Sequence, residues 1–295
     1  DHSRNRLKAW LDDGHILVDG AVWAGKQRLE GNETITATLP EAAQETDAQP
    51  EDIPLDIIFE DEHLIILNKP PGLVVHPGAG NREGTLLNAL LHHAPELANV
   101  ARAGIVHRLD KDTSGLMVVG KTEAACGALV AQLADRTMSR RYLAIVRGIT
   151  PSKGRIAAPI GRDVRQRLRM AVVPAGAGKD AVTHFERMAQ GRIDGHPASL
   201  VICTLETGRT HQIRVHLASL GHPLLGDSLY GGPDWGIARQ ALHAWALGLI
   251  HPVSRASVRW YSRPPADLDV LAARLGVDLT AQVRQWSEVD GERRG

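Results

Sequence analysis

The chain has 295 residues, enough for one large or two ordinary domains. Its 34 basic and 34 acidic side chains give a formal net charge of zero, which excludes a protein coated in positive charge. An RNA-binding chain of this composition must cluster its basic residues, because phosphate neutralisation is local. No apolar run reaches the roughly 18 residues of a membrane span, and no signal peptide is visible. The two cysteines lie in apolar runs without a partner at metal-ligand spacing, so we expect a reduced, cytoplasmic protein.

Residues 1–40 predict a small module that begins with a helix and continues with strands. The helix carries Arg4, Arg6 and Lys8 on one side and apolar residues at helical spacing on the other. Asp19-Gly20 between two apolar runs predicts a hairpin turn. A second pair of strands is expected at 28–39.

Residues 41–53 hold five acidic residues and no basic one, and we expect them to form a linker. The remainder, 54–295, is expected to be a second domain with many strands and interspersed helices. Strands are expected at 55–60, 64–68, 72–76, 116–119, 142–148, 181–188 and 198–206, and helices at 85–93, 122–133, 211–220 (capped by Thr210) and 268–275; the last dozen residues are expected to fray. Because strands and helices do not alternate regularly, the pattern favours an α+β fold with a largely antiparallel sheet.

A dense polar cluster lies between two apolar runs at 104–120, read as GIVHRLDKDTSGLMVVG. A polar turn held between two strands is a frequent place for catalytic residues. Asp110 and Asp112 would lie on one face if the segment is extended, so either could be a functional carboxylate. A Ser–His–Asp triad of Ser114, His107 and Asp110 is disfavoured, because the chain contains no G-x-S-x-G nucleophile elbow.

Four stretches, in order, resemble the pseudouridine synthases of the RluA type. They are LNKPPGLVVHPGAG at 67–80, HRLDKDTSGL at 107–116, RRYLAIVRG at 140–148 and ETGRTHQIRVHLASLGHPLLGDSLYGG at 206–232. The resemblance covers about residues 52–262. It implies an enzyme that converts uridine in RNA to its C-glycoside isomer without a cofactor, on a long mixed sheet with an active cleft across its middle. Within the family, the chain looks most like members that act on large-subunit ribosomal RNA.

The resemblance also implies roles for individual residues. Asp110 would be the catalytic carboxylate, which leaves Asp112 as a turn residue, and Arg214 would be the basic partner of Asp110. Tyr142 would stack on the target base and offer a phenol near its C5. Arg108 would enter the space that the flipped base leaves in the RNA, where a guanidinium plane offsets part of the unstacking cost.

Residues 3–20 resemble the S4 RNA-binding domain, so we expect Arg4, Arg6 and Lys8 to contact RNA. Two alternatives remain open: a synthase that acts on transfer RNA, and a non-catalytic RNA-binding factor in ribosome assembly. None of the 14 histidines forms an H-E-x-x-H pair, and His211 and His216 are five positions apart, off the helical ligand spacing. We therefore expect no metal. We also expect no cofactor, no membrane contact and a monomer.

Overall fold

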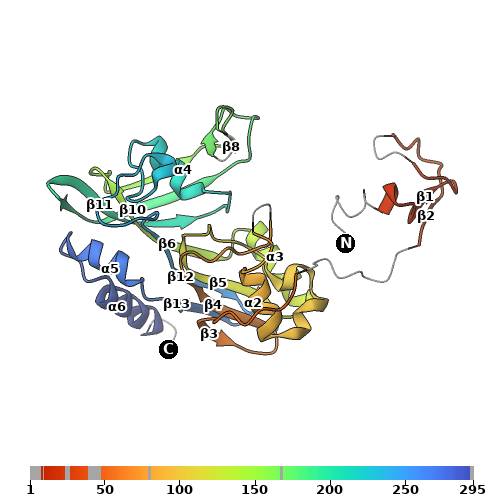
Figure 1. Cartoon of the computed structure of the whole chain (residues 1–295), viewed down its shortest axis with the longest axis horizontal. Coiled ribbons are helices and arrows are strands. Elements are labelled where there is room, and N and C mark those ends of the chain that lie inside the picture. The colour runs from red at the N-terminus through yellow and green to blue at the C-terminus, as the bar shows by residue number, and fades with distance from the viewer. Residues whose placement is uncertain are drawn as a thin grey trace. The chain divides into compact units, whose positions relative to one another are not determined.

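The computed structural model describes residues 8, 10–23, 27–38, 48–78, 81–166 and 169–292. The chain divides into two compact units, Asp1–Asp47 and Ala48–Gly295 (Figure 1). Within the described residues, no helix is both long and apolar enough to cross a bilayer.

The first unit holds a small antiparallel sheet in which β1 (Ile16–Val18) pairs with β2 (Ile35–Ala37). The predicted turn at Asp19-Gly20 is confirmed, because both residues have positive φ, +50° and +77°, as a type I′ turn requires. The expectation of a strand pair at 28–39 is wrong, since the described part of this segment, 28–38, supplies β2 alone.

Of the three basic residues of this unit that are expected to contact RNA, the structure describes one. Lys8 is exposed and lies 4.0 Å from Asp12, one helical turn away. Arg4 and Arg6 lie outside the described residues.

The second unit is built on a mixed sheet of nine described strands, in the order β3-β4-β5-β12-β6-β11-β10-β7, with β13 paired to β12. The strands are β3 (Ile57–Glu60), β4 (Leu64–Lys69), β5 (Ser114–Gly120), β6 (Ser139–Arg147), β7 (Lys153–Ala157), β10 (Val182–Ile193), β11 (His196–Leu205), β12 (Leu242–Ile250) and β13 (Ser257–Tyr261). Neighbours are antiparallel except β5 and β12, which run parallel. The predicted α+β class with a mainly antiparallel sheet is confirmed.

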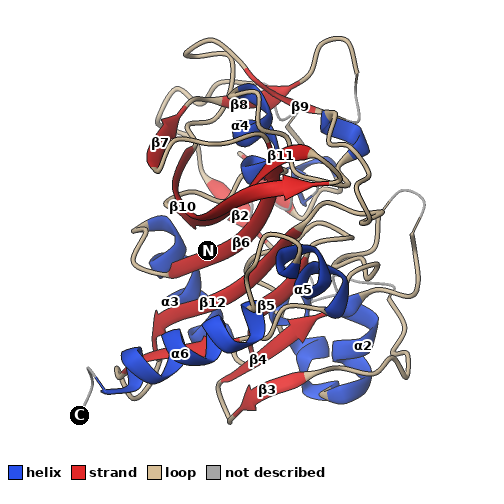
Figure 2. Ribbon diagram, turned by 90° about the vertical axis from the view of Figure 1, so that its left-hand side faces the viewer, coloured by secondary structure: helices blue, strands red, loops and turns tan. Residues whose placement is uncertain are grey.

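The central strands are apolar on both faces because helices cover both sides of the sheet. On one face, α2 (Leu86–His93) and α4 (Gln212–Ser219) share a buried cluster with alternate residues of β4, β5 and β6. On the other face, α5 (Ala266–Ala273) and α6 (Leu279–Glu292) pack against β6, β11 and β12 (Figure 2). The alternation along β6 sends Tyr142 to the first face and Leu143 to the second.

Shorter elements complete the unit. Helix α3 (Glu123–Ala134) begins at an N-cap, Thr122, whose hydroxyl accepts a hydrogen bond from the Ala125 N–H. The 3-10 helices η1 (Pro95–Asn99), η2 (Ala101–Gly104) and η3 (Ser228–Tyr230) lie in connections, and β8 (Ile160–Arg162) pairs with β9 (Met170–Val172) in a separate ribbon.

Three local expectations are wrong. Residues 72–76 form no strand, because the Val74 and Val75 carbonyls instead accept hydrogen bonds from the first N–H groups of α2. Thr210 does not cap α4; the N-cap is His211, in the left-handed conformation at φ +56°. The last dozen residues are helical as far as Glu292, because α6 buries Val283 against the sheet.

Candidate active site

A cavity of about 760 Å³ lies where the loop before β5 meets β6, β12 and the start of α4. All four residues that the sequence assigns to the reaction line it: Asp110, Tyr142, Arg214 and Arg108. Asp110 and Arg214 are 104 positions apart in the chain. They meet because β12 lies between β5 and β6 and joins the two halves of the sheet. Asp112, the rival carboxylate, is not among the residues that line the cavity.

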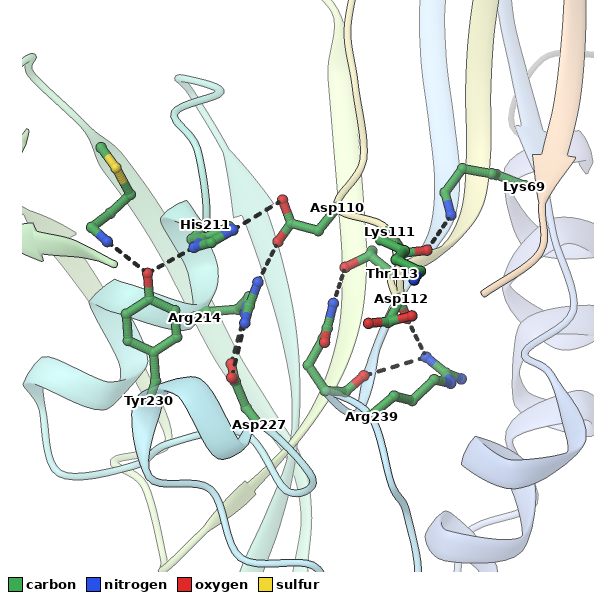
Figure 3. A network of polar contacts seen from close by, with 12 residues as sticks. Lys69, Asp110, Lys111, Asp112, Thr113, His211, Arg214, Asp227, Tyr230 and Arg239 are labelled. Atoms are coloured by element: carbon green, nitrogen blue, oxygen red, sulfur yellow. Dashed lines mark hydrogen bonds and ion pairs between the residues drawn. The ribbon is translucent and has the colours of Figure 1, made fainter. Parts of the chain in front are cut away.

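Arg214 links Asp110 to a second, fully buried carboxylate (Figure 3). Its Nη1 donates to Asp110 Oδ2 at 2.9 Å, while Nε and Nη2 donate to the two oxygens of Asp227 at 2.7 and 2.9 Å. The Asp227 side chain is 1 % exposed, against 18 % for Asp110. The bidentate pair fixes the plane of the guanidinium, and the guanidinium in turn fixes one oxygen of Asp110.

The charge state of Arg214 follows from these contacts. Burial alone would lower the pKa of its guanidinium, but the hydrogen bonds and charges of Asp227 and Asp110 outweigh burial and raise the pKa above its ordinary value. Arg214 is therefore a permanent cation hydrogen-bonded to Asp110.

His211 occupies the other side of Asp110. Its Nδ1 lies 2.8 Å from the hydroxyl of Tyr230, and that hydroxyl accepts the Met170 N–H at 2.9 Å. The two ring nitrogens of His211 therefore face different partners: Nδ1 faces the Tyr230 hydroxyl, and Nε2 lies 3.9 Å from Asp110 Oδ1. Burial lowers the pKa of His211, so the neutral form is favoured.

The loop that carries Asp110 is held from both sides through its backbone and Thr113 (Figure 3). On one side, the fully buried Lys69 Nζ donates to the Lys111 carbonyl at 2.8 Å and to two further carbonyls. On the other side, Arg239 donates to the Asp112 carbonyl at 3.0 Å and Gln240 donates to the Thr113 hydroxyl at 3.1 Å. These contacts preorganise the carboxylate before any substrate is present.

Tyr142 and Arg108 differ in exposure. Tyr142 is 6 % exposed, and burial raises the pKa of its phenol while the charge of Arg140 opposes that shift. Arg108 is exposed at the cavity. A buried ring can pack on a base inside the cavity, whereas an exposed guanidinium is free to enter bound RNA.

Comparison with known proteins agrees with this geometry. A model of the RNA pseudouridylate synthase family matches residues 63–219. The chain belongs to the RNA pseudouridylate synthase family. The ribosomal large subunit pseudouridine synthase D of Nitrosomonas europaea is 51 % identical over 91 % of this chain and 79 % of its own length. The protein of the same description from Escherichia coli is 47 % identical over 95 % of this chain and 88 % of its own.

A solved structure of the same family has the same architecture. Human RNA pseudouridylate synthase domain containing 1 superposes with a TM-score of 0.60, at 29 % identity, over 74 % of this chain and 87 % of its own. The expectations of a pseudouridine synthase fold and of an isomerase are therefore confirmed.

Several residues around the synthase site were missed by reading the sequence. Asp227, Tyr230 and Lys69 all lie within the quoted stretches, but a carboxylate, a phenol or a lysine in a motif does not reveal its partner. His211 could have been noticed only as a histidine in HQIR. Among the described residues, no group of three histidine, cysteine or carboxylate side chains is placed to hold a metal ion.

Proposed function

We propose that this synthase isomerises specific uridines to pseudouridine in large-subunit ribosomal RNA, without a cofactor, in the cytoplasm and as a monomer. The observation that supports the reaction best is the meeting of Asp110 with Arg214 in a cavity that Tyr142 also lines. Ribosomal RNA is supported by the names of relatives that are 46–51 % identical over at least 91 % of the chain.

The reaction breaks the bond between N1 and the sugar, rotates the uracil, and joins C5 to the same sugar carbon. A proton leaves C5 and a proton is gained at N1, so atoms and electrons balance without a redox partner. Attack on the sugar, attack on the ring and abstraction of a sugar proton all require one ionised carboxylate oxygen facing the substrate. Asp110 offers this oxygen, because Arg214 binds Oδ2 and leaves Oδ1 toward His211.

The other cavity residues have complementary proposed roles. Tyr142 packs on the uracil and places its phenol near C5, where a proton must be removed. Arg108 occupies the position of the flipped uridine in the RNA. In the first unit, Lys8, Arg4 and Arg6 are proposed to contact RNA as part of an S4-like module formed by residues 1–40, with 41–53 as its linker to the catalytic domain.

The test is replacement of the carboxylate. Asp110→Asn should lower the rate of pseudouridine formation on a large-subunit ribosomal RNA transcript by about 10⁴-fold or more, as loss of a catalytic nucleophile or base does. RNA binding and melting temperature should stay near those of the unaltered protein. Asp112→Asn is the matched control and should retain activity, because its side chain is outside the cavity. An Asp110→Asn protein with near-normal activity would refute the assignment.

The substrate is tested separately by mapping pseudouridines in total RNA of a strain lacking the gene. Loss of sites in large-subunit ribosomal RNA is expected. Loss in transfer RNA would indicate the first alternative, and loss of no site would indicate a non-catalytic assembly factor.

A further inference from the structure

Arg140 is a cavity residue that the reaction described above does not use. It lies on β6 two positions before Tyr142, so both side chains leave the same face of the sheet. Arg141, between them, points to the opposite face and lies over the ring of Trp245 at 5.1 Å. Arg140 is only 7 % exposed, yet it lines the cavity.

The guanidinium of Arg140 has no acceptor within the part of the chain that the structure describes. Its Nε is buried without a hydrogen-bond partner, and no ion pair or hydrogen bond to its other nitrogens is present there. Gly208 leaves room for the group, since a Cβ at that position would lie 2.6 Å from Arg140 Nη1. A buried cation without a partner is costly to keep, so its charge is expected to meet an acceptor that the folded protein lacks.

The charge balance of the cavity indicates an anion. Five arginines line it, against one carboxylate, Asp110, which already pairs with Arg214. The remaining four have no ion pair among the described residues: Arg102, Arg108, Arg140 and Arg209. A uracil carbonyl would satisfy hydrogen bonds but not charge, whereas a phosphate group satisfies both and fits the planar fork of a guanidinium.

We propose that Arg140 binds a backbone phosphate of the RNA next to the flipped uridine and thereby positions the nucleotide between Tyr142 and Asp110. This inference rests on the proposed function, because it takes the ligand to be RNA. Arg140 is in this role a positioning residue, and it does not react with the base or the sugar.

The test is a double-mutant cycle in which the charge of the Arg140 side chain and the charge of one phosphate are removed, first separately and then together. Full-length protein, as the unaltered chain, Arg140→Gln and Arg140→Lys, is assayed on a ribosomal RNA fragment that carries its mapped target uridine. The same fragment is made with an uncharged methylphosphonate at the linkage on either side of that uridine. Arg140→Gln should lower kcat/KM by about 10- to 100-fold, as loss of a charge-assisted hydrogen bond does, and Arg140→Lys should restore part of it.

One methylphosphonate should cause a loss of similar size in the unaltered protein and little further loss in Arg140→Gln. The melting temperature of Arg140→Gln should be unchanged or higher, because the variant removes an unpaired buried charge. Arg284→Gln, on the exposed side of α6, is the control and should behave like the unaltered protein.

If the fold-losses in kcat/KM from Arg140→Gln and from the methylphosphonate simply multiply, at both linkages, the proposal is overturned and a contact to the base is favoured. A large fall in melting temperature for both Arg140 variants would overturn it in favour of a structural role. Binding of the fragments, followed by fluorescence anisotropy, separates this inference from the function. If the unaltered protein binds the fragment but forms no pseudouridine, the proposed function fails. The same double-mutant cycle, with binding affinity in place of kcat/KM, then still decides the role of Arg140.

Discussion

Replacement of Asp227 by alanine should slow the synthase, although Asp227 does not line the cavity. Asp227 accepts two hydrogen bonds from Arg214 at 2.7 and 2.9 Å, and its side chain is 1 % exposed. Removing one partner of a buried ion pair costs about 3–5 kcal/mol. Arg214 keeps its bond to Asp110, so we expect the lower end, about 3 kcal/mol. In a domain of this size, that lowers the melting temperature by about 6–12 °C.

The effect on activity should fall on kcat. Without Asp227, the guanidinium of Arg214 loses the two hydrogen bonds that fix its plane. Asp110 is bound to the same guanidinium, so its carboxylate should shift as well, and a displacement near 1 Å costs about 10²-fold in rate. Asp227 does not line the cavity, so KM should change little. The assay is pseudouridine formation under saturating and limiting RNA, together with a melting curve.

Asp194→Ala is a matched control for this experiment. Asp194 is bound to Arg274 in a surface ion pair and is 63 % exposed, so loss of the pair should cost at most about 1 kcal/mol. Its backbone is left-handed, at φ +49°, so alanine adds about 1–2 kcal/mol of strain there, and kcat should still be unchanged. An Asp227→Ala protein that melts lower but keeps its full kcat would refute the argument that Arg214 transmits order to Asp110.

Two further predictions concern stability against pH. Burial lowers the pKa of Lys69 to about 7, although Asp112 and Asp110 oppose the shift. Above pH 7, Lys69 loses its proton in the folded protein but keeps it in the unfolded chain. The free energy of unfolding, measured with urea, should therefore rise from pH 7 to 8.5 by up to about 1.4 kcal/mol per pH unit relative to Lys69→Met. Parallel curves for the two proteins would contradict this. Burial lowers the pKa of His107 to about 3 and of His243 to about 4. These rings stay neutral in the folded protein while unfolded histidines bind protons below about pH 6.5, so stability should fall from pH 6.5 toward 4, and less steeply in His107→Gln. An unchanged slope in that variant would show that His107 does not contribute.

The sequence was sufficient to predict the candidate site residues that lie in motifs, but not the side chains that those residues contact. HRLD and HQIR named Asp110 and Arg214 as candidates, and the irregular order of strands and helices predicted the fold class. The contact between Arg214 and Asp227 could not be predicted, because it depends on how η3 packs beside α4 and not on any local pattern. The helix start at His211 was also missed, since the left-handed backbone there is set by tertiary contacts and local propensity favoured Thr210.

The same limit applies to burial. Lys69 ends a strand whose pattern gives no sign that its ammonium is fully enclosed, and Arg140 belongs to a run of arginines that would usually be solvated. In both cases the side chain is buried because a distant segment covers it, and single-sequence reasoning has no access to that segment. The predicted strand began at Tyr142, whereas β6 begins at Ser139, and this longer strand places Arg140 and Tyr142 on one face.

The position of β12 in the sheet has a consequence for biosynthesis. This strand lies between β5 and β6, yet it is translated roughly a hundred residues after them. Domains generally fold from the N-terminus during synthesis, but here the two parts of the sheet cannot join until residue 250 has been added. The growing polypeptide therefore contains the segments that carry Asp110 and Tyr142 long before it can bring them together, and the assembled site forms only after β12 has been synthesised.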